Sequence, residues 1–168
     1  MSSGRRPSTE ALGTRDRAAA AADFAASSLE SARRRLGGRA RPPSARALGS
    51  LVEGTRRDAE PHAGVVLWAS EHHCDVWFDD GVPRRVAADS IRPSPGPTPE
   101  PLVAVAADIR VFDALREGER VRWDRSIGVA EGYIAEKCRW GAIVVTEAGK
   151  VLAVGFRRLW PASVHTMA

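Results

Sequence analysis

Basic and aromatic residues alternate along the last third of the chain, a combination that suits binding by stacking and by charge. Indole and guanidinium groups stack on nucleic acid bases or on arginine-rich peptides. The pattern is carried by Arg120, Arg122, Arg125, Lys137, Arg139, Arg157 and Arg158, with Trp123, Trp140, Phe156 and Trp160. In an alternative interpretation, Trp123 and Trp160 close a hydrophobic core while the arginines stay solvated on its rim.

A second group of arginines lies in residues 1–50, which contain ten Arg and four acidic residues. Guanidinium groups make bidentate contacts with phosphates, so this arm is a candidate for binding a nucleic acid backbone. A solvated tail and an organellar transit peptide are the alternatives. The four acidic residues argue against the transit peptide. The nucleic-acid-binding candidates are Arg33, Arg34, Arg35, Arg39 and Arg41 in the arm, and Arg120, Arg122, Arg139, Trp140, Arg157 and Arg158 beyond it.

Residue types that could support catalysis or metal binding are scattered. His72-His73-Cys74, with His62, superficially resembles a zinc site, but consecutive histidines on a turn do not face one ion and no second ligand pair follows. No nucleophile elbow, phosphate loop or forced carboxylate pair occurs. The sequence therefore predicts a protein that is not an enzyme and has no metal and no cofactor.

An internal repeat tells which elements carry these residues. Residues 64–93 and 132–161 align without a gap at an offset of 68, with Gly64 on Gly132 and Gly81 on Gly149. We therefore predict two copies of one strand-rich unit, the first module (residues 51–93) and the second module (residues 115–168). Duplication multiplies surfaces, which favours a binding protein.

The residue pattern of each module predicts four or five short strands joined by tight turns. In the first module, the strands are expected at Leu51–Arg57, Gly64–Ser70, Cys74–Phe78 and Arg84–Ala87, with a glycine turn at Gly81. In the second module, a loop at Ser126–Glu131 is expected after a strand that contains Val121 and Trp123. Such a meander predicts a mostly β fold with two tandem SH3-like, partly open barrels.

One stretch of the first module resembles the core of a Tudor domain. It reads Asp75-Val76-Trp77-Phe78-Asp79-Asp80-Gly81, followed by Val86 and by Asp89-Ser90-Ile91-Arg92-Pro93. The resemblance covers about thirty residues in each module. In that family, an aromatic cage binds methylated lysine or arginine in a protein tail. The resemblance implies a similar fold and a peptide ligand here.

By position, the resemblance makes Phe78 the cage aromatic and Asp79 its polar partner, with Trp68 or Trp77 as further walls. A cage needs several rings, because each aromatic face contributes only modestly to binding a cation. Neighbours on a strand point to opposite faces, so only one of Trp77 and Phe78 can face the barrel interior. The alternative is that one of these two rings is core and the other lies at a surface or interface.

Outside the modules, the sequence predicts a partly helical arm and a stiff linker. Within residues 1–50, a helix is expected at about 14–36, capped by Thr14 or Asp16 and ended by Gly37-Gly38. Residues 94–114 begin with a proline-rich connector. The apolar segment that follows alternates at Val103 and Val105, which favours a strand at Leu102–Ala106 over a short helix.

Composition narrows the function classes. The net charge is +4, and the excess lies in the arm, because the first module has five basic and eight acidic residues. Two cysteines are too few for a disulfide framework. No apolar run approaches the ~20 residues that cross a bilayer. We expect a soluble, intracellular protein of the nucleus or cytoplasm, or of an organelle if the arm is a transit peptide, without membrane contact.

Two functional hypotheses follow. In the first, the diverged modules form a non-catalytic adaptor for a protein or peptide tail, including a methylated one. In the second, the arginine-rich arm and the second module bind RNA or DNA, or anchor the chain as a structural subunit of a nucleoprotein complex such as a chromatin or ribonucleoprotein assembly. The sequence leaves the oligomeric state open.

Overall fold

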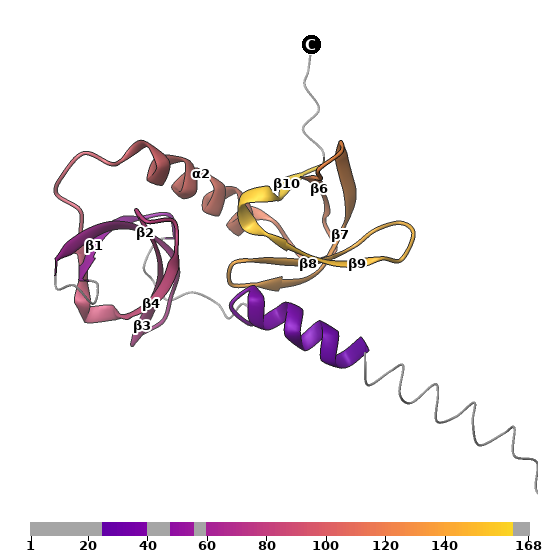
Figure 1. Ribbon diagram of the computed structural model, residues 1–168, viewed down its shortest axis with the longest axis horizontal. Coiled ribbons are helices and arrows are strands. Elements are labelled where there is room, and N and C mark those ends of the chain that lie inside the picture. Colours follow the sequence, from indigo (N-terminus) through magenta and orange to yellow (C-terminus); the bar gives the residue numbers. More distant parts are fainter. Residues whose placement is uncertain (1–24, 40–47, 56–59, 163–168) are drawn as a thin grey trace, which may run out of the picture.

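A computed structural model describes residues 25–39, 48–55 and 60–162 of the chain. Two five-stranded antiparallel sheets follow one another along the chain, with a helix between them (Figure 1). The prediction of a mostly β fold with an N-terminal helix is confirmed, since residues 25–35 are helical. The predicted cap at Thr14 or Asp16 lies outside the described residues.

The first module contains β1 (Leu51–Thr55), β2 (Pro61–Ala69), β3 (His73–Phe78), β4 (Pro83–Ala87) and β5 (Ile91–Pro93). The strands lie in the order β4-β3-β2-β1-β5, so β5 returns to pair with β1. A 3-10 turn at Ala88–Ser90 leads into β5. The four strands predicted for this module are present, and the last two residues of the first predicted strand lie outside the described residues.

The second module contains β6 (Arg120–Asp124), β7 (Val129–Cys138), β8 (Gly141–Val145), β9 (Val151–Gly155) and β10 (Trp160–Pro161). Their order, β10-β6-β7-β8-β9, repeats that of the first sheet. The bulge between Val66 and Trp68 recurs between Ile134 and Glu136, at the offset of 68 found in the sequence. The repeat is therefore structural. The loop predicted at Ser126–Glu131 is shorter than expected, because β7 already begins at Val129.

Two pairs of glycines occur at matching positions of both modules because the backbone there requires glycine. Gly81 and Gly149 have positive φ angles of 79° and 76° in the turns after β3 and β8, a conformation that side chains disfavour. Gly64 and Gly132 lie where the chain has no room for a side chain. A Cβ at Gly64 would come within 2.5 Å of Val76, and one at Gly132 within 2.5 Å of the Val145 carbonyl oxygen.

The segment between the modules is a helix, α2 (Glu100–Ala114), and the strand expected at Leu102–Ala106 is wrong. The alternation of Val103 and Val105 indicates one strand face, but only Val105 is buried, since Val103 points outward and is 53% exposed. The buried residues, which are Leu102, Val105, Ala106, Ile109 and Phe112, recur every three or four positions and form one helical face. Pro101 fits in the first turn, where its missing N–H has no helical acceptor.

One hydrophobic core joins both modules. The first module has its own interior, which contains Val66, Val76 and Phe78. The opposite face of β2, with Val65 and Leu67, packs with α2 and with the interior of the second module. Small domains have thin cores. The two modules compensate by sharing apolar burial through α2, so we describe them as one folded unit.

The N-terminal helix lies on the outer face of the second sheet. Leu29, Ala32 and Leu36 pack against Cys138 and Ile143. Backbone bonds fix the end of the helix, since the amides of residues 139 and 140 donate to the carbonyl oxygens of residues 38 and 36. Residues 29–39 of the arm are thus anchored on the second module. No helix in the described part of the chain is long and apolar enough to span a membrane.

Candidate functional site

The module junction is organised around Asp75, whose side chain is fully buried on β3. Arg85 Nε donates to its carboxylate at 2.9 Å, and Trp140 Nε1 donates at 3.2 Å. Arg139 lies 3.5 Å from the same carboxylate and stacks over the Trp68 ring at 4.1 Å. The carboxylate thus binds one cation from its own module and one from the other, which fixes the modules relative to each other.

The aromatic residues predicted for a cage face separate surroundings. Phe78 is fully buried inside the first module. Trp77 points to the opposite face, as expected for its strand neighbour, and its ring meets Phe156 edge-on at 5.9 Å. Trp68 is 8% exposed and is covered by the guanidinium of Arg139. Asp79 is exposed and lies 3.6 Å from His62. These four residues do not line one common pocket.

The arm arginines predicted to bind nucleic acid divide into two groups. Arg33 makes a bidentate contact with Glu136, with Nη2 at 2.8 Å, and Arg39 lies 3.3 Å from the same carboxylate. These two guanidinium groups therefore help to dock the arm. The other candidates in the arm are Arg34 and Arg35, which are exposed, and Arg41, which lies outside the described residues.

Most of the second-module candidates also bind within the protein. Arg120 pairs with Glu131 at 2.8 Å, and Arg157 pairs with Asp108 of α2 at 3.1 Å. Trp140 and Arg139 belong to the junction described above. The remaining candidates are Arg158, whose guanidinium donates to the carbonyl oxygen of Asp124, and Arg122, which is exposed. Of the described second-module candidates, only Arg122 is exposed without an ion pair or side-chain hydrogen bond within the protein, which leaves it to contact a phosphate backbone.

Lys137 is a structural cation. Its Nζ donates to the carbonyl oxygens of Phe112, Asp113 and Leu115 at 2.9–3.0 Å, and it lies 4.7 Å from the centre of the Phe112 ring. Burial lowers the pKa of Lys137. The ammonium group satisfies carbonyls at the C-terminal end of α2, where a positive charge is favourable. Lys137 therefore attaches α2 to β7.

Neither cysteine forms a disulfide, and the two are buried in different clusters. Burial raises the pKa of Cys138 to about 11, so its thiol is protonated and unreactive at neutral pH. Among the described residues, no group of three or more His, Cys, Asp or Glu side chains could hold a metal ion. His72 and His73 are exposed.

The docking of the arm is expected to depend on pH. The contact with Arg33 holds the pKa of Glu136 below its usual value of 4.5. A carboxylate whose pKa falls on folding stabilises the folded state above its unfolded pKa, and this contribution is lost as the pH falls through the lower, folded-state pKa. We expect the amide-exchange protection that residues 29–36 show at neutral pH to fall as the pH drops below 4.5.

The matched control is Glu136→Gln, which should show reduced protection of the helix at neutral pH and a smaller further loss on acidification. Protection of residues 29–36 that stays constant over this pH range in the unaltered chain would show that the Arg33 contact does not hold the arm.

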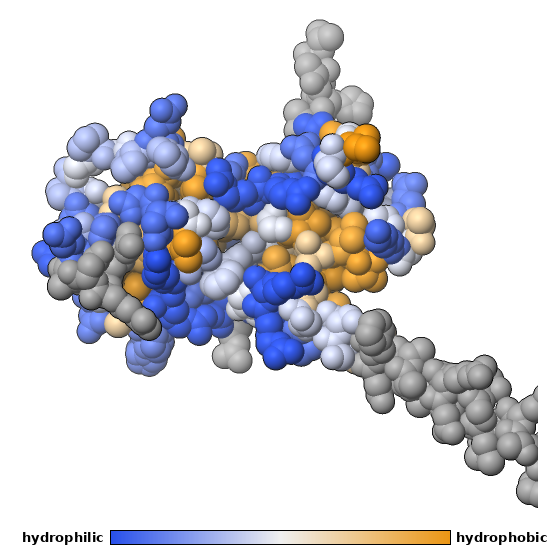
Figure 2. Space-filling model, in the orientation of Figure 1, coloured by the Kyte–Doolittle hydropathy of each residue, from blue (hydrophilic) through white to orange (hydrophobic). Residues whose placement is uncertain are grey.

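One pocket lies at one end of the second module. A pocket of about 580 Å³ forms between the loop that joins β6 to β7 and the turn that joins β8 to β9. Its lining includes Trp123, Arg125, Val129, Glu147, Lys150 and Leu152, and we call it the loop pocket. Ile127, on the same β6–β7 loop, is 91% exposed, and Val129 is 61% exposed. Figure 2 shows further hydrophobic surface over β8 and β9.

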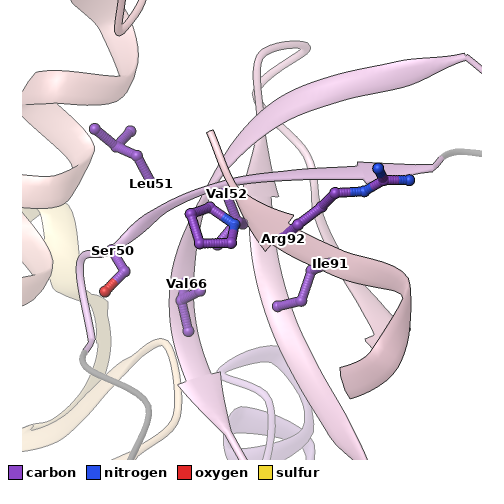
Figure 3. A pocket seen from close by; sticks show the side chains of 7 residues that line it. Ser50, Leu51, Val52, Val66, Ile91 and Arg92 are labelled. Carbon is purple, nitrogen blue, oxygen red and sulfur yellow. The ribbon is translucent and has the colours of Figure 1, made fainter. Parts of the chain in front are cut away.

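The first module has a groove of about 550 Å³ between β1, β2 and β5 (Figure 3). Val52, Val66 and Ile91, which belong to the module's own buried core, line it together with Ser50. The Arg92 guanidinium points away from these apolar side chains (Figure 3). The groove therefore offers apolar contact and little polar specificity.

Sequence reasoning missed the loop pocket. Trp123 was singled out as a core or stacking residue, but Ile127 and Val129 were assigned to a loop without a role. The signal was available, because two large apolar residues beside Gly128 in a predicted loop are unusual unless they contact something. Models of known protein families do not match this chain, and curated proteins do not match it either.

Proposed function

We propose that the chain is a non-catalytic adaptor that binds a protein or peptide partner through its second module. In this proposal, the two sheets are Tudor-like, SH3-like barrels, consistent with their shared strand order and bulge. The first module acts mainly as a scaffold, because its outer face is used to hold α2 and the second module.

The observation that carries the proposal is the exposure of Ile127 and Val129 beside the loop pocket. Burying one large aliphatic side chain contributes about 1.5–3 kcal/mol, so leaving two in water is costly unless a partner covers them. The rim provides polar contacts, with Arg125 and Lys150 as cations and Glu147 as an anion. An apolar centre with a polar rim is the ordinary anatomy of a protein-binding site.

The site corresponds to the Tudor-like turn of the first module. At the offset of 68, Glu147 and Gly149 match Asp79 and Gly81. In the first module this end carries Phe78, which is fully buried and gives no free ring to a ligand. Trp68 is already covered by Arg139. We therefore propose a peptide ligand for the second module and no methyl-ammonium cage in the first.

Protein binding is favoured over nucleic acid binding because of how the arginines are used. Phosphate contacts require cations that are free to meet the backbone. Arg33, Arg120 and Arg157 each pair with a carboxylate of the chain itself. Among the candidate arginines that the structure describes, nucleic acid binding would rest on the exposed Arg34, Arg35 and Arg122.

Replacing Ile127 by aspartate tests the proposal. A library of random linear peptides is selected against the full chain, and the enriched peptides are titrated onto the unaltered chain and onto Ile127→Asp. We expect the affinity to fall at least about tenfold, because an apolar contact is replaced by a charge that must be desolvated. The fold should be unaffected, since the side chain lies almost entirely in solvent.

Val103→Asp is the matched control, because this side chain is also exposed but lies on α2. It should leave peptide affinity unchanged. Peptides that bind equally well to all three proteins would reject the loop pocket as the site, and failure to enrich any peptide would reject the proposed function.

A further inference from the structure

In the part of the chain that the structure describes, the second module has an open sheet edge. β9 lies at the edge of its sheet, as β4 does in the first module. Natural edge strands usually carry charges or proline, which prevent another chain from pairing with them. β9 reads Val-Leu-Ala-Val-Gly and has neither. Its first residue, Val151, is 55% exposed, and Ala153 is exposed as well.

The hydrogen bonds to β8 show which backbone groups of β9 face outward. Thr146 N donates to the Lys150 carbonyl oxygen at 3.0 Å, and Phe156 N donates to the Trp140 carbonyl oxygen at 2.9 Å. In antiparallel sheets, hydrogen-bonded residue pairs alternate with pairs that are not hydrogen-bonded. These two bonds therefore decide which residues of β9 between 150 and 156 bond to β8. The N–H and C=O groups of Val151, Ala153 and Gly155 therefore point away from the sheet, where an added strand could bond them.

The duplicated strand provides a natural comparison. The same alternation in β4, fixed by the bond from Ala88 N to the His72 carbonyl oxygen, turns residues 83, 85 and 87 outward. These match residues 151, 153 and 155 of β9 at the offset of 68. Pro83 has no N–H to donate, and Arg85 places a charged side chain on this edge. The first module thus has a blocked edge where the second has an open one.

Both faces of β9 offer space for the side chains of an added strand. On the outer face, a groove of about 740 Å³ separates β9 from the N-terminal helix, and its lining includes Ala25, Leu29, Ala32 and Arg35. On the other face lies the loop pocket, which shares Leu152 with this groove. Alternate side chains of an extended peptide would enter the two spaces in turn.

We propose that β9 binds an extended apolar and acidic segment of a partner protein as an additional strand of the second sheet. This rests on the proposed protein-binding function and adds the conformation and charge of the partner. Arg35 lines the groove, and Lys150, just before β9, lines the loop pocket. Acidic side chains of the partner would therefore find a cation in each of the two spaces. Antiparallel pairing of two copies would bring Lys150 of one near Arg157 of the other, and like charges oppose it.

The test copies the blocked edge into the second module. The double variant Val151→Pro and Ala153→Arg introduces the residues of Pro83 and Arg85 at the matching positions. Neither change removes a bond to β8, so the unfolding midpoint should stay close to that of the unaltered chain. The probe is a fluorescent peptide of about ten residues in which valine and glutamate alternate, a length suited to one strand.

We expect the probe to bind the full chain and to bind the double variant at least about tenfold more weakly, because proline removes the outward N–H of residue 151 and the proline ring obstructs strand pairing there. N-methylation of one alternate set of probe amides should abolish binding, and methylation of the other set should not. A probe with lysine in place of glutamate should bind more weakly than the acidic one.

Several results would overturn the proposal. These are absence of acidic probe binding, equal binding to the double variant, equal binding of the lysine probe, and indifference to both sets of N-methyl groups. Dimerisation in sedimentation that the double variant abolishes would assign the edge to a second copy. Ile127→Asp should weaken probe binding less than the double variant does. If it abolishes binding while the double variant does not, the peptide lies in the loop pocket, and the proposed function stands without the added strand.

Discussion

Replacing Asp75 by alanine is expected to lower the free energy of unfolding by about 3–5 kcal/mol, because it leaves buried cationic and polar groups without their partner. Trp140 would lose its acceptor, and Arg139 would keep only its stacking on Trp68. Arg139 Nε is already buried without a hydrogen-bond partner, so this guanidinium has little to replace the carboxylate. Urea unfolding followed by tryptophan fluorescence measures the effect.

Asp80→Ala is the matched control for this prediction. Asp80 also pairs with an arginine of the first module, Arg84 at 2.6 Å, but at the surface. Solvent-exposed ion pairs contribute about 0–1 kcal/mol, so its loss should cost far less. Equal, small effects of the two substitutions would show that the Asp75 cluster does not hold the modules together.

Replacing Phe112 by alanine is expected to cost about 3–5 kcal/mol and to destabilise both modules together. Phe112 is buried on α2, where its ring lies 6.4 Å from that of Phe156 and beneath Lys137. Phe156 in turn contacts Trp77 of the first module. Amide signals of Phe78 and Ile134, one from each interior, should be lost at the same urea concentration in the unaltered chain and at a lower, still common concentration in the variant.

Val103→Ala serves as the control on the same helix, because its side chain points into solvent. Surface substitutions of this kind usually change stability by less than about 0.5 kcal/mol. Separate transitions for the two modules in the unaltered chain would contradict the shared core.

The repeat made much of the fold predictable. Strand positions follow from β-branched and aromatic residues between glycine turns, and both copies obey the offset of 68 down to the bulges at Trp68 and Glu136. The local sequence pattern does not distinguish helix from strand where only one side of an element is buried. In α2, valine and alanine alternate from Val103 to Ala106, so a strand period and a helix period both fit these residues, and only the packing of Ile109 and Phe112 selects the helix.

The contacts of the candidate residues could not be predicted, because they join positions far apart in the sequence. Nothing near Trp68 indicates that Arg139 covers it, and nothing near Arg33 indicates that Glu136 binds it. Most of the candidate arginines that the structure describes therefore have partners within the protein. The open edge of β9 was equally hidden, since it emerges only when Pro83 is compared with Val151 in matching strands.

The most direct test of the proposed function is an amide chemical-shift titration of the full chain with a library-selected peptide, run beside a titration with a generic single-stranded RNA. We predict that the peptide shifts signals of residues 124–129 and 146–150, the two walls of the loop pocket, and that the RNA leaves these signals in place. Peptide titration that leaves both segments unchanged, with RNA shifting Arg34, Arg35 and Arg122, would contradict the proposal and assign the chain to nucleic acid binding.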